Sequence, residues 1–189
     1  RGVDLDIFSP QAVPVARILA LAQRWRLPDG VPVVMLPGRL TRWKGHAVFL
    51  DALARLGDVE CMGVIVGGDQ GRTSYREEIE ERIAALNLAT KVRIVGDVND
   101  MPAAFLLSDV VVSASTDPEA FGRIAVEAQA MGRPVIASNH GAAPETVIES
   151  VTGWLVPPAD PAALAGAIRK ALGLTEEQRH AMAYAAETH

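Results

Sequence analysis

The 189-residue sequence has one cysteine, no hydrophobic run of membrane-spanning length and no excess of basic residues. Cys61 cannot form a disulfide within the chain, so we expect a small core residue and a reducing, cytoplasmic setting. No apolar stretch approaches the roughly 20 residues that a transmembrane helix needs. The net charge of −5 argues against a nucleic-acid-binding surface, which needs clustered, unopposed Lys and Arg. One anionic ligand needs only two or three cations.

Two common nucleotide-binding fingerprints are also missing. The chain has no G-x-G-x-x-G that opens a helix and no G-x-x-x-x-G-K-[ST] loop. These loops bind the phosphates of dinucleotides and of nucleoside triphosphates, respectively. Redox chemistry with a dinucleotide and P-loop hydrolysis therefore both lose support.

The residues that are present predict one α/β domain. Hydrophobic residues make up 49% and charged residues 22%, which is typical of a globular protein. Short β-rich runs alternate with helical periodicity over residues 31–189, which predicts a Rossmann-like, doubly wound sheet of about six parallel strands with helices on both faces. The six runs are Val31 to Leu36, Cys61 to Val66, Val92 to Val95, Val110 to Val112, Val135 to Ser138 and Gly153 to Val156.

The segments between these runs show helix signals. Ile79, Ile83 and Leu86 form one apolar stripe, and Asp100 and Asp160 are expected to cap helices. Residues 1–30 are interpreted as a lead-in with a helix from about residue 14 to 25. Because the chain begins without Met and stops within a helix-like segment, we expect a fragment of a longer protein.

In sheets of this kind, ligands bind at the carboxyl ends of the strands. The first strand is followed by Gly38-Arg39-Leu-Thr-Arg-Trp-Lys44-Gly45. A diphosphate carries about two negative charges, and each unlike pair at ~4 Å attracts by roughly 4 kcal/mol at an effective dielectric near 20. Arg39 and Lys44 could hold a diphosphate, or they could be solvated loop cations.

A second anion-compatible feature is the helix that starts near Gly122, because the first turn of a helix has unpaired N–H groups and a partial positive charge. Glu119 precedes this turn and Glu127 lies in the helix. We expect the two carboxylates on the order of 10 Å apart, a spacing that suits two hydroxyl-bearing groups bridged by a diphosphate. The alternatives are an i, i+4 pair between Glu127 and Arg123, and a dipole-stabilising role for Glu119.

The segment Glu119-Ala-Phe-Gly-Arg-Ile-Ala-Val-Glu127 resembles the E-x7-E motif of retaining GT-B glycosyltransferases, especially family 4 (group 1). Further segments resemble landmarks of that family in the same order along nearly the whole chain. They are Arg1–Asp4, Phe8–Pro10, Gly38-Arg39, Lys44-Gly45, Val66–Asp69, Val95-Gly96, Ala128–Ala137, Pro144-Glu145 and Thr152–Pro157.

The resemblance implies a C-terminal domain that binds a nucleoside diphosphate sugar, linked to UDP or GDP, while an N-terminal acceptor domain absent from this chain completes the enzyme. It implies a retaining hexosyl transfer that needs no metal or cofactor, in cell-surface polysaccharide, lipopolysaccharide or glycolipid synthesis. The expected location is the cytoplasm, including the inner face of a membrane. This fragment alone is expected to be inactive.

By the same resemblance, Arg39, Lys44 and Glu119 are the catalytic residues: the two cations bind the diphosphate and Glu119 contacts the sugar. Glu127 holds the ribose. Further donor contacts are expected from the residues around these groups, namely Gly38, Gly67, Gly96, Ala120, Phe121, Gly122, Arg123 and Ile124.

Some residues depart from the family pattern or lie outside it. Gly67-Gly68-Asp69 and Gly141-Ala142 stand where the family often has Gly-Asp-Gly and Gly-Gly, so these loops are expected to contact the ligand differently. For His46, His140 and Asp117 a capping or surface role is favoured over a ligand contact, and Trp25, Trp43 and Trp154 are expected to be packing residues. A sugar-nucleotide epimerase and a non-catalytic binding module remain open as alternatives to a transferase.

Overall fold

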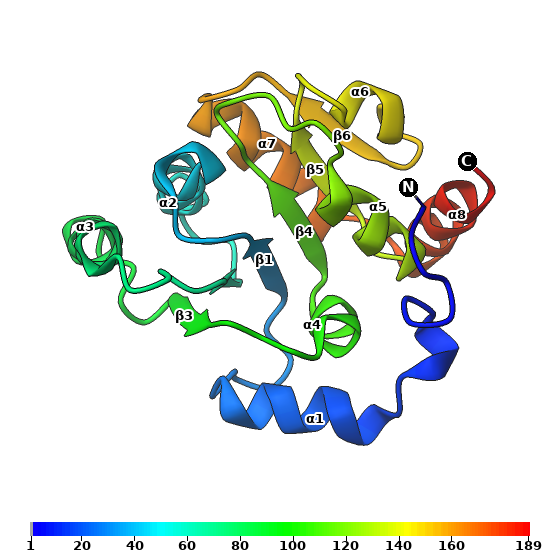
Figure 1. The fold of residues 1–189 in the computed structure, drawn as a ribbon, viewed down its shortest axis with the longest axis horizontal. Helices are drawn as coiled ribbons and strands as arrows, with labels where there is room; N and C mark the ends of the chain where they lie inside the picture. The colour runs from blue at the N-terminus through cyan, green and yellow to red at the C-terminus, as the bar shows by residue number, and fades with distance from the viewer. Residues whose placement is uncertain (1) are drawn as a thin grey trace.

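The computed structural model describes residues 2–189 and contains one parallel sheet of six strands (Figure 1). The strands run in the order β3-β2-β1-β4-β5-β6, which confirms the predicted doubly wound sheet. Their bounds lie within two residues of the predicted ones. The strands are β1 Val33–Pro37, β2 Met62–Val66, β3 Val92–Gly96, β4 Val110–Ser113, β5 Val135–Ser138 and β6 Gly153–Val156.

Eight α-helices and two short 3-10 helices connect and flank the strands in the described part of the chain. Asp100 and Asp160 cap α4 and α7 as predicted, by accepting hydrogen bonds from the backbone N–H of Ala103 at 3.2 Å and of Ala163 at 2.9 Å. The helices are α1 Val15–Arg24, α2 His46–Ala54, α3 Thr73–Ala85, α4 Met101–Leu107, α5 Arg123–Ala130, α6 Ala143–Thr146, α7 Pro161–Leu172 and α8 Glu176–Thr188, with η1 Pro10–Ala12 and η2 Arg42–Lys44.

The helices cover both faces of the sheet, so its central strands are buried on both sides. In β1, Val34 and Leu36 pack into a core with α2, α3 and α7, whereas Val33 and Met35 pack into a second core with α1, α4 and α5. Side chains alternate between faces along a strand. The continuous apolar runs in the sequence thus supply both cores.

Residues 10–30 are part of the packed domain. Helix α1 lies against α4, and Val13, Leu21 and Trp25 are buried in the second core. The guanidinium of Arg17 pairs with Asp100, with 2.8 Å between Nε and Oδ2. Arg1, the first residue of the landmark segment Arg1–Asp4, lies outside the described residues.

The strand order places a topological switch point between β1 and β4. The chain leaves β1 for α2 on one face of the sheet and leaves β4 for α5 on the other. Loops that diverge in this way open a crevice at the carboxyl edge of the sheet. The loop with Arg39 and Lys44 and the loop with Glu119 therefore face the same crevice. Within residues 2–189, none of the helices is both long and apolar enough to cross a membrane.

Candidate functional site

The loop after β1, residues 38–45, is held in place by its neighbours. The backbone N–H of Gly38 donates to the carbonyl of Val66 at 2.8 Å, and that of Leu40 donates to the carbonyl of Gly68 at 3.0 Å. Gly45 has φ 78°, and a Cβ at this position would lie 1.8 Å from the carbonyl oxygen of Ala114. Only glycine permits this contact between the loops after β1 and β4.

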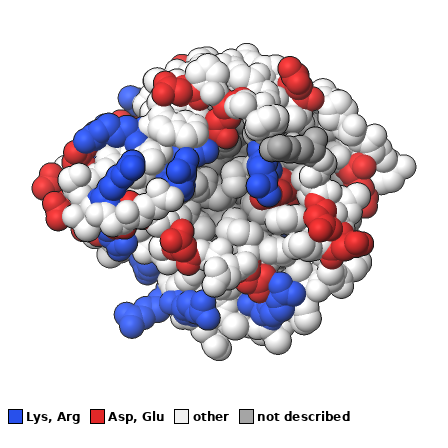
Figure 2. Space-filling model, viewed as in Figure 1, with Lys and Arg blue, Asp and Glu red and all other residues white. Residues whose placement is uncertain are grey.

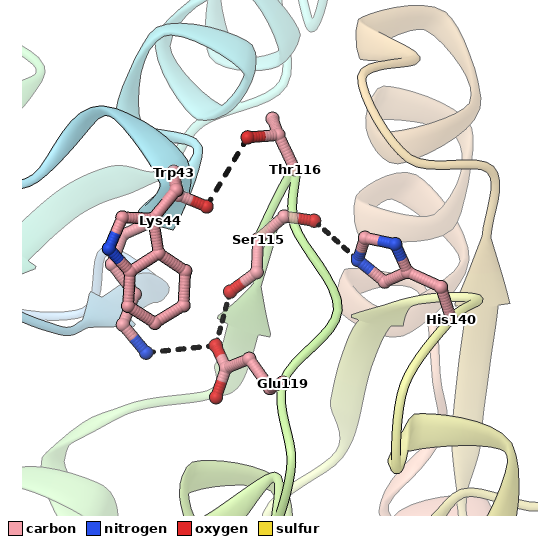
Figure 3. A network of polar contacts seen from close by, with 6 residues as sticks. All are labelled: Trp43, Lys44, Ser115, Thr116, Glu119 and His140. Atoms are coloured by element: carbon pink, nitrogen blue, oxygen red, sulfur yellow. Dashed lines mark hydrogen bonds and ion pairs between the residues drawn. The ribbon is translucent and has the colours of Figure 1, made fainter.

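The structure brings Lys44 and Glu119 together. Lys44 Nζ lies 2.8 Å from Glu119 Oε1, and their side chains are only 14% and 18% exposed. Ser115 also donates its hydroxyl to Glu119, and the carbonyl of Ser115 lies 2.8 Å from Nε2 of His140 (Figure 3). The sequence placed Lys44 and Glu119 in one site but did not predict this ion pair.

Two residues of this network, Ser115 and Thr116, were missed by the sequence analysis. The backbone N–H of Thr116 donates to the carbonyl of Trp43 at 2.8 Å, and its hydroxyl donates to the same carbonyl at 3.4 Å (Figure 3). These contacts tie the two loops together next to Lys44. Polar residues directly after β4 were the available signal. The partner of Thr116 lies 73 residues away along the chain. Ser115 has one partner four residues away, Glu119, and another 25 residues away, His140, so local sequence could have indicated only the contact with Glu119.

Arg39 and Arg42 differ in their surroundings although both belong to the loop after β1. Arg39 is exposed and makes no side-chain hydrogen bond or ion pair within residues 2–189. Arg42 pairs with Glu78, with 2.6 Å between Nη2 and Oε1, and lies over the ring of Tyr75. Of the two guanidinium groups, the one of Arg39 is available to a ligand.

The aromatic and histidine predictions have mixed outcomes. Trp25 and Trp154 are buried as expected, and half-buried Trp43 has Lys44 Nζ 4.3 Å from its ring centroid. The capping or surface role favoured for His46 is wrong, because its side chain is fully buried. Burial was not evident from the sequence, since His46 begins a helix beside a charged loop and the residue that covers it, Tyr75, comes from α3.

The first turn of α5 is open to a ligand. Gly122 is the N-cap with φ 52° and offers no side chain to the first-turn N–H groups, while Phe121 is 65% exposed. Arg123 and Ile124 begin the helix, so their N–H groups have no partner inside it. Basic side chains flank a hollow near the centre of the face in Figure 2. Unpaired N–H groups and the helix dipole favour an anion at this turn.

Glu127 lies one turn further along α5 and is 7% exposed. Its Oε1 accepts a hydrogen bond from Nη2 of Arg123 at 3.0 Å, so the i, i+4 pair weighed as an alternative does form. Burial raises the pKa of the Glu127 carboxyl, and the Arg123 charge only partly counteracts this. A buried carboxylate with one partner retains acceptor capacity for hydroxyl groups.

We expect Glu127→Gln to stabilise the chain at neutral pH. The folded-state pKa of Glu127 lies above the ordinary value of 4.5, so the cost of burying its charge is absent below that pH and develops as pH rises through the folded-state pKa. Urea unfolding should show a larger free energy of unfolding for the variant at pH 7 and convergence with wild type at acidic pH. Glu60→Gln, at an exposed position, is the control. A difference between Glu127→Gln and wild type that is independent of pH would contradict the expectation.

The loops after β2 and β3 meet the loop after β1 at the same edge. A Cβ on Gly67 would lie 1.9 Å from the carbonyl oxygen of Gly38, and the N–H of Gly67 donates to the carbonyl of Gly96 at 2.8 Å. Gly68 donates its N–H to Oδ1 of Asp97 at 2.9 Å. Gly38, Gly67 and Gly96 are therefore neighbours, as a shared ligand would require.

The remaining residues named from the sequence lie close to Glu119, either in the loop after β4 or packed against that loop. Ala120 is exposed between Glu119 and Phe121, and Asp117 is also exposed. Gly141 is packed so closely against Glu119 that a Cβ would lie 2.5 Å from the Glu119 carbonyl oxygen. Within residues 2–189, no group of three or more His, Cys, Asp or Glu side chains could hold a metal ion. The donor contacts of all these residues stay predictions.

The sequence and fold can be compared with known proteins. The family model described as "Glycosyl transferases group 1" matches residues 19–189. The D-inositol 3-phosphate glycosyltransferase of Jonesia denitrificans is 35% identical over 185 residues, which cover 93% of this chain and 42% of that protein. This chain thus spans less than half the length of that curated relative.

Solved structures share the fold over the whole chain. A glycosyltransferase from Rickettsia africae has a TM-score of 0.95 at 34% identity, covering 100% of this chain and 50% of that chain. The Anabaena protein HepE in complex with UDP-glucose has a TM-score of 0.89 at 30% identity, covering 99% of this chain and 50% of that one. The chain, with its Rossmann-like fold shared with one half of GT-B glycosyltransferases, belongs to the group 1 family of glycosyl transferases.

Proposed function

We propose that this chain is the donor-binding domain of a retaining glycosyltransferase that moves a hexosyl group from a nucleoside diphosphate sugar to an acceptor. Three kinds of observation support the proposal: membership of the family, a similar solved protein that holds UDP-glucose, and the chemistry of the crevice. The observation that carries it is the contact between Lys44 and Glu119, 2.8 Å apart at the switch point, beside the unpaired Arg39.

The contact between Lys44 and Glu119 suits the junction of a sugar and a phosphate. A phosphate oxygen accepts hydrogen bonds and a sugar hydroxyl donates one, so an ammonium next to a carboxylate matches the two groups on either side of the anomeric bond. Glu119 offsets most of the charge of Lys44. The uncompensated positive charge for the diphosphate then comes from Arg39 and from the first turn of α5.

In the proposed reaction the bond between the anomeric carbon and the diphosphate oxygen breaks, and negative charge grows on the leaving group. Arg39 and Lys44 stabilise that charge, which is electrostatic catalysis by preorganised groups. Glu119 orients the sugar and Glu127 binds the ribose hydroxyls. The acceptor attacks from the face that the diphosphate leaves, so anomeric configuration is retained, and no metal or cofactor takes part.

The remaining parts of the enzyme follow from the same proposal. An N-terminal domain in the full-length protein supplies the acceptor site, so this chain alone is inactive. The acceptor belongs to cell-surface polysaccharide, lipopolysaccharide or glycolipid synthesis, and the enzyme works in the cytoplasm, at the inner face of the membrane. UDP is the preferred test nucleotide because the similar Anabaena protein binds UDP-glucose, and GDP is the alternative.

Calorimetric titration of this chain with UDP and with GDP tests the proposal. We expect one nucleotide to bind, and Glu127→Ala to weaken its binding by roughly 10- to 100-fold, because hydrogen bonds to a charged group contribute about 1.5–3 kcal/mol. Asp117→Ala removes an exposed carboxylate from the neighbouring loop and should leave the affinity unchanged. A folded sample that binds neither nucleotide would refute the donor-binding role. Product analysis of the full-length protein with donor alone separates transfer from epimerisation.

A further inference from the structure

Two buried polar atoms lack hydrogen-bond partners, and both belong to the segment that carries the site cations. Within residues 2–189, Nε2 of His46 and Oγ1 of Thr41 are the buried side-chain nitrogen or oxygen atoms without a partner. Arg39 and Lys44 lie in the same eight-residue stretch. A buried polar group without a partner carries a free-energy cost, because it has lost its hydrogen bonds to water. Such a cost at a proposed ligand site calls for a functional explanation.

His46 is neutral at physiological pH. Burial, and secondarily the charge of Lys44, lowers the pKa of its imidazole to about 4, while the Thr41 carbonyl raises it. Tyr75 is the other titratable group against the ring, with its hydroxyl oxygen 3.4 Å from Nδ1, and burial raises the pKa of that phenol, so it keeps its proton. Neutral imidazole has one N–H and one acceptor nitrogen.

The neighbours of the ring indicate which nitrogen carries the proton. The Tyr75 hydroxyl occupies Nδ1 and can donate to it, which leaves Nε2 as the N–H. Nε2 is buried and completes no hydrogen bond, although the Thr41 carbonyl is close enough to the imidazole to raise the pKa of His46 as an acceptor does. That carbonyl already accepts the backbone N–H of Lys44 at 3.1 Å. A carbonyl oxygen has two lone pairs, so it can accept a second hydrogen bond.

We propose that His46 is a positioning residue. When the loop of residues 38–45 binds the diphosphate of a donor, Nε2–H of His46 donates to the Thr41 carbonyl. Because the same carbonyl accepts the backbone N–H of Lys44, the new bond holds Lys44 in place. The inference rests on the proposed donor-binding function. In the unliganded chain this bond is unmade and Nε2 of His46 has no partner. Closing it on the ligand recovers that cost and favours the bound loop.

Binding of UDP and of uridine to this chain tests the proposal, because only UDP has the diphosphate that the loop would hold. His46→Leu removes the donor and should weaken UDP binding roughly five- to tenfold, with uridine binding unchanged. His46→Gln keeps a side-chain N–H and should restore most of the UDP affinity. Phe49→Leu alters another fully buried residue of α2 and should change neither affinity. Circular dichroism verifies that each variant is folded.

The outcomes separate the two proposals. Wild-type chain that binds neither UDP nor GDP refutes the donor-binding function itself. If it binds GDP alone, GDP and guanosine take the places of UDP and uridine. Suppose that wild type binds UDP. If His46→Leu then binds UDP equally well, or if its affinities for UDP and for uridine fall by the same factor, the positioning role is overturned while the donor-binding function stands. A second measurement does not depend on variants: NMR of the imidazole nitrogens should show an Nε2–H tautomer whose proton moves downfield on addition of UDP. An Nδ1–H tautomer would overturn the proposal.

Discussion

Arg39→Ala is expected to lower kcat of the full-length enzyme about 100-fold, with a smaller change in KM for the donor. Removal of one preorganised group that stabilises developing charge typically costs 10²- to 10³-fold in rate, by analogy with oxyanion-hole donors. Arg39 is exposed and has no ion-pair partner in residues 2–189, whereas the charge of Lys44 is already offset by Glu119. We therefore expect the loss to appear in kcat, because Arg39 would stabilise the charge that grows on the leaving group in the transition state. Steady-state kinetics with a radiolabelled donor measure it.

Arg42→Ala is the matched control for Arg39→Ala, because it removes the same charge from the same loop. The guanidinium of Arg42 is engaged by Glu78 on α3 and does not point to a free site. We expect less than about a twofold change in kcat, since exposed ion pairs contribute little. Equal losses for the two variants would show that net loop charge matters rather than the placement of Arg39, and an unchanged kcat for Arg39→Ala would remove its catalytic role.

Gly45→Ala is expected to destabilise the chain by about 2–5 kcal/mol. A left-handed backbone costs a non-glycine residue roughly 1–2 kcal/mol, and overpacking a rigid site adds about 1–3 kcal/mol. The added Cβ would lie 1.8 Å from the backbone oxygen of Ala114, which cannot rotate away as a side chain could. Urea unfolding measures the loss. UDP binding should also weaken, because relief of this overlap moves Lys44 away from Glu119.

Gly57→Ala separates the backbone effect from the overlap. Gly57 has φ 59°, and a Cβ there would meet no atom within 4 Å. We expect a loss of about 1 kcal/mol from the left-handed conformation alone and unchanged UDP binding. If Gly45→Ala cost no more than Gly57→Ala, the contact with Ala114 would not constrain the loop after β1.

Much of the fold could be predicted from the sequence because its signals are local. Each strand is a short run of mostly apolar residues, and Asp100 and Asp160 stand directly before helices that they cap. Strands that are buried on both faces need apolar side chains throughout, so these runs stand out from the amphipathic helices. The rule that ligands bind at the carboxyl ends of parallel strands then located the loops of the candidate site.

The structure brings the predicted glycines and charged residues of the candidate site to one edge of the sheet, but the pairing of the charges was not predicted. Lys44 was predicted to bind phosphate and Glu119 to bind sugar, yet no local pattern joins residues 75 positions apart. The same holds for Arg42, which finds Glu78 on α3, while Arg39 three residues earlier finds no partner in the described chain. The two arginines carry the same charge and belong to the same loop. Only the packing of α3 beside α2 distinguishes them.

By itself the sequence determined the element order, the sheet and the edge at which we expect a ligand, because these depend on hydrophobic runs, caps and turns within a few residues. The tertiary structure alone decided that Lys44 contacts Glu119, that Glu127 is buried beside Arg123, and that Nε2 of His46 is buried without a partner in residues 2–189. These features depend on how closely the loops after β1 and β4 approach across the switch point. That approach is set by backbone contacts such as Gly45 against Ala114, between residues far apart in the chain.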